Sequence, residues 1–83
     1  MIYIYTQDQC PPCQFVKQYF KDHQIQFEER NITHHNEYKK ELIIKYDAMS
    51  TPFILIDDEK IYHVDFDKIE SVLKDKKYLS SSS

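Results

Sequence analysis

The chain has no glycine, no tryptophan and only two cysteines. Without glycine, turn positions with positive φ must be taken by Asn or Asp, or avoided. The candidates for such positions are Asn31, Asn36, Asp47 and the Asp57-Asp58 pair. No apolar run approaches the length of a membrane span, and the first residues, from Met1 to Tyr5, lack the basic start of a secretory signal. We therefore expect a cytoplasmic protein that does not insert into a membrane.

Charge and length narrow the function classes further. With 14 acidic and 11 basic residues, the net charge is −3, whereas a surface that binds the phosphate backbone of a nucleic acid is usually positive. Nucleic-acid binding is therefore not expected. A length of 83 residues fits one small domain, which we assign to residues 1–79. Residues 80–83 are all serine, and we expect this tail to be disordered.

Hydrophobic patterning predicts an α/β domain in which strands and helices follow the order β-α-β-α-β-β-α. The strands are expected, in chain order, at residues 2–6, 25–32, 53–56 and 61–64, with a turn at 57–60. A right-handed βαβ unit, followed by a hairpin and a closing helix, gives a four-stranded mixed sheet with helices on its faces.

Each helix has an expected start and an expected apolar side. The first begins at Cys10, with Pro11 in its first turn, and carries the stripe Phe15, Val16, Tyr19, Phe20 and His23. The second is expected to be capped by Thr33 and to bury Tyr38, Leu42, Ile43 and Tyr46. The last is expected to be capped by Asp65 or Asp67 and to bury Phe66, Ile69, Val72 and Leu73.

Cys10 and Cys13 form a C-x-x-C motif at the expected start of the first helix. At an N-cap, Cys10 would meet free backbone N–H groups and the positive end of the helix dipole, which favour a thiolate. Cys13 lies about one turn further along, near enough to bridge to Cys10. The pattern indicates that Cys10 attacks a disulfide and that Cys13 resolves the mixed disulfide. The alternatives are two core thiols or half of a zinc site, but zinc usually needs four ligands and no second C-x-x-C exists.

Both residues between the cysteines are proline. An N-cap sulfur accepts hydrogen bonds from the N–H groups at positions N2 and N3 of the helix. Position N2 would be Pro12, which has no N–H, so only Cys13 can donate. Asp8 adds a nearby negative charge. We therefore expect the pKa of Cys10 to be lowered less than in a motif with a donor at N2, and the couple to be more reducing.

Thr51-Pro52 stands directly before the apolar run at 53–56. Such a pair often stands at the first residue of a strand and has an ordinary trans peptide bond. Because it follows a strand, a C-x-x-C motif and a helix, we expect a cis bond here. This bond would turn the backbone of Thr51 toward Cys10 and leave its N–H and C=O free to pair with an extended peptide.

Together these features resemble the glutaredoxins of the thioredoxin superfamily. The resemblance covers about residues 1–77 and rests on Tyr5-Thr6, Cys10-Pro11-Pro12-Cys13, Thr51-Pro52 and Phe66-Asp67-Lys68-Ile69. It implies a thioredoxin fold and a monomeric thiol–disulfide oxidoreductase that reduces protein disulfides or mixed disulfides. Such a protein takes part in electron transport and cell redox homeostasis. It needs no bound cofactor and no metal, and glutathione or a thioredoxin reductase supplies its electrons.

The resemblance also implies a substrate and glutathione site, although the match is poorer there. Its expected contacts are Gln7, Pro11, Pro12, Thr51, Pro52, Phe66 and Asp67. Glutaredoxins usually carry Lys at the place of Gln7, commonly Tyr at that of Pro12, and Gly-Gly where this chain has Val64-Asp65. We therefore expect weak glutathione use, as in the redoxins that serve ribonucleotide reductase.

Two other functions stay open at this point. An iron–sulfur or other metal-binding protein would hold a cluster with Cys10 from two subunits, but the neighbouring proline and the missing glutathione contacts argue against it. A redox-switched regulatory module would resemble the Spx and arsenate reductase branch, to which residues 27–32 and 52–73 are similar. Proteins of that branch usually carry Arg where this chain has Thr51, and a large helical insertion that this chain lacks.

Overall fold

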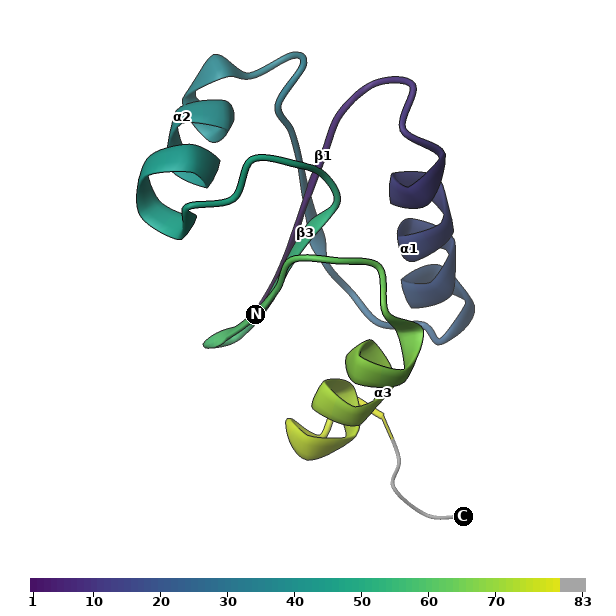
Figure 1. Ribbon diagram of the computed structural model, residues 1–83. Helices are drawn as coiled ribbons and strands as arrows, with labels where there is room; N and C mark the ends of the chain where they lie inside the picture. The colour runs from purple at the N-terminus through teal and green to yellow at the C-terminus, as the bar shows by residue number, and fades with distance from the viewer. Residues whose placement is uncertain (80–83) are drawn as a thin grey trace.

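Four strands form one mixed sheet in the computed structural model, which describes residues 1–79 (Figure 1). They are β1 (Ile2–Thr6), β2 (Glu28–Asn31), β3 (Phe53–Ile56) and β4 (Glu59–Ile61), in the spatial order β2-β1-β3-β4. β1 pairs in parallel with β2 and antiparallel with β3, and β4 pairs antiparallel with β3. The element order is the expected β-α-β-α-β-β-α, so the predicted fold class is confirmed.

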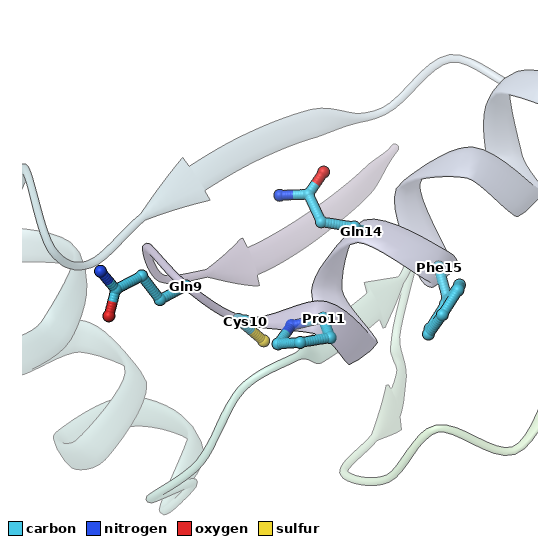
Figure 2. Close-up of a pocket in the computed structure, with 5 residues that line it drawn as sticks. All are labelled: Gln9, Cys10, Pro11, Gln14 and Phe15. Atoms are coloured by element: carbon cyan, nitrogen blue, oxygen red, sulfur yellow. The ribbon is translucent and has the colours of Figure 1, made fainter.

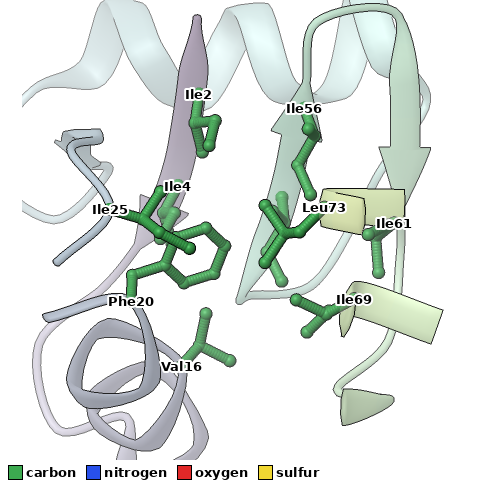
Figure 3. Packing of buried hydrophobic residues seen from close by; sticks show 10 residues of the cluster. Ile2, Ile4, Val16, Phe20, Ile25, Ile56, Ile61, Ile69 and Leu73 are labelled. Atoms are coloured by element: carbon green, nitrogen blue, oxygen red, sulfur yellow. The ribbon is translucent and has the colours of Figure 1, made fainter. Parts of the chain in front are cut away.

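Helices cover both faces of the sheet. They are α1 (Pro11–Asp22), α2 (Asn36–Tyr46) and α3 (Phe66–Asp75), with α1 and α2 on opposite sides (Figure 1). Alternation along β1 and β3 sends every second side chain to each side, so the sheet is buried on both faces. The first core lies between the sheet and the helices α1 and α3 (Figure 3), and contains Ile2, Ile4, Val16, Phe20, Ile25, Ile54, Ile56, Ile61, Ile69 and Leu73. The second core lies under α2 and contains Tyr5, Leu42, Tyr46, Ala48, Phe53 and Leu55.

The buried stripe of α1 differs from the expected one. Its buried residues are Cys13, Val16 and Phe20, while Phe15 is 66% exposed. Positions three and seven residues after Cys13 share its face of the helix, whereas Phe15 lies two residues on and therefore on the outer side. The prediction that Phe15 lies in the core was therefore wrong.

The segment between α1 and α2 also departs from expectation. β2 is shorter than residues 25–32, because only Glu28–Asn31 lies opposite β1 in register. Thr33 does not cap α2: the N-cap is His35, which makes no side-chain capping bond. The Thr33 hydroxyl instead accepts a hydrogen bond from the backbone N–H of Asp8 at 3.0 Å. Ile43, expected inside, is exposed on α2.

The hairpin of β3 and β4 is tighter than predicted, and α3 has one of its two expected N-caps. Glu59 and Lys60 pair with β3, so the turn is confined to the residues before them, and β4 ends at Ile61. Asp65 is the N-cap of α3, and its carboxylate accepts from the backbone N–H of Lys68 at 3.2 Å. The expected burial of Phe66 was wrong, since it is 39% exposed at the start of the helix.

Positive φ values occur at residues that the sequence predicts and at others that it does not. Asp47 and Asp57 adopt them as expected, whereas Asn31 and Asn36 lie in regular elements. The remaining positions are Gln9, Gln24 and Lys77. Turn geometry therefore overrides the residue preference at some sites. The predicted serine tail lies outside the described residues, and within residues 1–79 no helix is long and apolar enough to cross a membrane.

Candidate redox site

The two cysteines lie where the loop after β1 enters α1. Cys10 is the N-cap, with extended backbone angles of φ −120° and ψ 91°, and Pro11 and Pro12 occupy the first two helical positions. The backbone N–H of Cys13 donates to the sulfur of Cys10 at 3.2 Å. The expected capping arrangement, with Cys13 as the donor and none at Pro12, is confirmed.

A disulfide joins Cys10 and Cys13, whose Cα atoms are 5.3 Å apart. Cys10 retains 6% of its surface, whereas Cys13 is fully buried under the start of α1. Of the two cysteines, only Cys10 therefore keeps surface that a reaction partner can reach. This asymmetry fits an attacking residue at position 10 and a resolving residue at position 13.

Thr51 and Pro52 face the disulfide from the loop before β3. Their peptide bond is cis, as predicted, and Pro52 is buried. The Thr51 hydroxyl lies 3.7 Å from the Cys10 sulfur, so residues 41 positions apart meet at one point. Among residues 1–79, no hydrogen bond engages the backbone N–H or C=O of Thr51. That these two groups pair with an extended substrate stays a prediction.

A shallow pocket of about 440 Å³ opens beside Cys10 and is lined by Gln9, Cys10, Pro11, Gln14 and Phe15. Figure 2 shows the Cys10 sulfur next to the ring of Pro11, with Phe15 further along α1. Sequence reasoning did not select Gln9, Gln14 or Phe15. A helical projection that took Cys13 as buried would have placed Phe15 on the outer face and next to the motif.

The other predicted contacts are distributed around the site. Gln7 lines a separate pocket of about 510 Å³, together with Lys39 and Met49. Phe66 lines a pocket with Phe15 but does not line the one at Cys10. Pro12 and Asp67 are exposed. The roles of these side chains in binding glutathione or a substrate stay predictions.

Side-chain contacts with the segment between β2 and α2 hold the loop that precedes Cys10. The Asp8 carboxylate accepts from the amide of Asn31 at 3.1 Å and lies 3.0 Å from the His34 ring nitrogen. With the Thr33 bond to the Asp8 backbone, these contacts fasten the loop to the segment between β2 and α2. They hold Gln9 at φ 56°, directly before the N-cap.

A second polar network fixes α1 against the sheet. Buried Thr6 donates to the Glu29 carboxylate at 2.7 Å, and Lys17, one turn after Cys13, donates to the same oxygen at 2.9 Å. Burial alone would raise the pKa of Glu29, but the bonds from Thr6 and Lys17 outweigh it and lower that pKa below its usual value. Glu29 is therefore an anion that ties α1 to β1 and β2.

Comparison with known proteins identifies the family. The sequence model of the glutaredoxin family matches residues 2–61, which is more than half of the chain. The chain belongs to the glutaredoxin family. A search among curated proteins finds no match. Within residues 1–79 of this glutaredoxin, no cluster of three or more His, Cys, Asp or Glu side chains is arranged to hold a metal ion.

Solved structures extend the comparison over most of the chain. The thioredoxin-like protein BC3987 is 33% identical, with 88% of this chain and 100% of that chain covered and a TM-score of 0.84. Glutaredoxin 1 from Francisella tularensis is 28% identical over 93% of this chain and 94% of its own, with a TM-score of 0.64. The glutaredoxin-like NrdH-redoxin from Escherichia coli, described as having a thioredoxin-like activity profile, shares the fold. It is 22% identical over 86% of this chain and 92% of its own, with a TM-score of 0.77.

Proposed function

We propose that this glutaredoxin is a thiol–disulfide oxidoreductase that reduces protein disulfides or mixed disulfides. The observation that carries the proposal is the position of Cys10: it is the one cysteine of the pair that keeps exposed surface, it stands at a helix N-terminus, and its sulfur lies 3.7 Å from the hydroxyl of Thr51. A helix N-terminus favours the thiolate that must attack, and a buried partner one turn away is placed to resolve the intermediate.

The reaction takes two exchanges. In the reduced protein, the Cys10 thiolate attacks one sulfur of the substrate disulfide, the substrate S–S bond breaks, and the other substrate sulfur leaves as a thiolate that takes up a proton. The Cys13 thiol then loses its proton and attacks the Cys10 sulfur, which releases the second substrate sulfur. Two electrons have passed to the substrate, and the protein is left with the Cys10–Cys13 disulfide seen in the structure.

We further propose that a thioredoxin reductase, rather than glutathione, returns the two electrons. Gln7 offers no positive charge where glutaredoxins commonly carry Lys, and the family's Gly-Gly pair is absent. BC3987 is called a thioredoxin-like protein and the NrdH-redoxin has a thioredoxin-like activity profile, and both descriptions agree with this choice. The protein would then work as a soluble dithiol carrier between the reductase and its substrate.

A coupled assay of NADPH oxidation tests both parts. One arm contains thioredoxin reductase and the other contains glutathione with glutathione reductase, each with the same disulfide substrate. We expect turnover in the first arm and little in the second. Cys10→Ser should abolish turnover, whereas Cys13→Ser should trap a covalent mixed disulfide that dithiothreitol releases. Turnover that persists in Cys10→Ser would refute the mechanism, and turnover with glutathione alone would refute the choice of donor.

A further inference from the structure

We propose that a groove between α1 and α3 selects the substrate: it binds an aromatic side chain a few residues from the attacked cysteine and then, further along the chain, a basic side chain. This inference rests on the proposed function and adds the chemistry of the substrate to it. The groove holds about 320 Å³ and is lined by Phe15, Gln18, Tyr19, Asp22 and Phe66.

The groove continues the pocket at the disulfide. Phe15 lines both the pocket that contains Cys10 and the groove that contains Phe66. A polypeptide whose disulfide reaches Cys10 can therefore run along the outer face of α1 and stay in contact with first the Cys10 pocket and then the groove. Figure 2 shows Phe15 on this course along α1, beyond Cys10 and Pro11.

Three of the residues that line the groove are aromatic: Phe15, Tyr19 and Phe66. Phe15 and Phe66 are 66% and 39% exposed, and no other phenylalanine of residues 1–79 is among the exposed large hydrophobic residues. The rings of Tyr19 and Phe66 lie 5.2 Å apart at a tilt of 40°, so they present adjoining apolar faces. A third ring laid against them gains apolar burial and offset aromatic contact, which favours Phe, Tyr or Trp as the bound side chain.

A negative charge at the end of the groove away from Cys10 favours a basic side chain in the substrate. Asp22 is the only charged residue that lines either this groove or the Cys10 pocket. Its carboxylate accepts from the Gln18 amide at 2.8 Å, which directs it along the groove side of α1. An anion with no cation beside it in the lining attracts Lys or Arg and repels acidic segments.

Helix geometry gives the spacing. Phe15 and Tyr19 lie about 7 to 14 Å beyond Cys10 along α1, and Asp22 about 18 Å, at 1.5 Å per residue. An extended chain covers about 3.3 Å per residue, so the aromatic residue falls about two to four residues from the attacked cysteine. The basic residue falls about five or six residues from it.

Synthetic peptides test the proposal with the wild-type protein. Each peptide carries one cysteine as a mixed disulfide with 2-mercaptoethanol, an aromatic residue about three places away and Lys about six places away, in both chain directions. Matched peptides replace the aromatic residue by Ser, or Lys by Glu. In the direction that fits, we expect kcat/KM to fall about tenfold without the aromatic residue and about threefold to tenfold with Glu.

Two variants of the protein, each with a matched control variant, complete the design. Asp22→Lys should reverse the preference between the Lys and Glu peptides, whereas Asp75→Lys, at the last residue of α3, should not. Phe15→Ser should lower the ratio of kcat/KM for the aromatic and Ser peptides toward one. Ile44→Ser, which alters an 80% exposed side chain on α2, should leave that ratio as in the wild type.

Each outcome decides the matter. Equal kcat/KM for all peptides overturns this inference and leaves the proposed function intact, whereas no reduction of any peptide or of a small disulfide overturns both. A reversal by Asp75→Lys as large as that by Asp22→Lys would show an effect of total charge and overturn the role of the groove. So would a dimer in sedimentation that dissociates in Phe15→Ser, because a second copy would then be the occupant.

Discussion

Replacing Pro12 should change the acidity of Cys10 in a direction that the helix start fixes. The Cys10 sulfur has one backbone donor, the N–H of Cys13 at 3.2 Å, because the residue at N2 is proline. Pro12→Tyr and Pro12→Ala each supply an N–H at N2, which is the other position from which an N-cap side chain accepts. We expect both variants to lower the pKa of Cys10 in the reduced protein.

The magnitude follows from the strength of one such bond. A hydrogen bond to a charged group contributes about 1.5 to 3 kcal/mol, and we take the lower end because the Cys10 sulfur already accepts a hydrogen bond from the N–H of Cys13. At about 1.4 kcal/mol per pKa unit, the pKa of Cys10 should fall by about one unit. The same stabilisation of the thiolate should make the couple about 30 mV more oxidising.

Thiolate absorbance as a function of pH measures the pKa, and equilibration with a glutathione buffer measures the potential. Pro11→Ala is the matched control, because the N–H at N1 does not reach an N-cap side chain, and it should leave the Cys10 pKa unchanged. The reasoning would be refuted by a Cys10 pKa that stays the same or rises in both Pro12 variants. A drop in Pro11→Ala as large as in Pro12→Ala would point to backbone relaxation instead.

Two further predictions concern stability and are measured by urea unfolding. Thr6→Val removes the hydroxyl that holds the Glu29 carboxylate and should cost about 1 kcal/mol near pH 7. Because folding lowers the pKa of Glu29, the stabilisation by its carboxylate is fully present above the pKa of Glu29 in the unfolded chain, and it should shrink as the pH falls through the pKa in the folded protein. A loss of stability in Thr6→Val that does not depend on pH would contradict the network with Lys17. Leu73→Ala in the core should cost about 2 to 5 kcal/mol and exposed Ile44→Ala less than about 0.5, and similar losses in both would contradict the core assignment.

Strong local patterns made most of the fold predictable. The apolar run of β3 and the proline at the start of α1 fix elements by residue type alone, and both were placed correctly. β2 is a charged strand, and its bounds depend on which residues lie opposite β1, a long-range fact that local pattern does not contain. Thr33 fits a helix cap by type, but its hydroxyl bonds to the backbone of Asp8, 25 residues earlier.

The chemical centre of the site was predictable, and its rim was not. C-x-x-C with the downstream Thr-Pro specifies the pair Cys10 and Cys13 and the residues that face it, because the motif sets both the helix start and the chemistry. Phe15 was misplaced because its neighbour Val16 is buried, and an apolar pair at adjacent positions does not show which member faces inward. Such surface aromatic residues are found only when the orientation of the helix is known.

The absence of glycine should lower the free energy of unfolding where a residue with a side chain adopts a positive φ. Gln24 adopts φ 57° in the turn after α1, a region that costs a residue with a side chain about 1 kcal/mol or more. Gln24→Gly removes that cost and should be neutral or stabilising by up to about 1 kcal/mol, after the entropy that glycine loses on folding. Gln26, also exposed and two residues later, is not at positive φ, so Gln26→Gly bears the entropy loss alone and should destabilise by about 0.5 to 1 kcal/mol. Unfolding free energies that fall equally in the two variants would show that the left-handed turn costs this chain nothing.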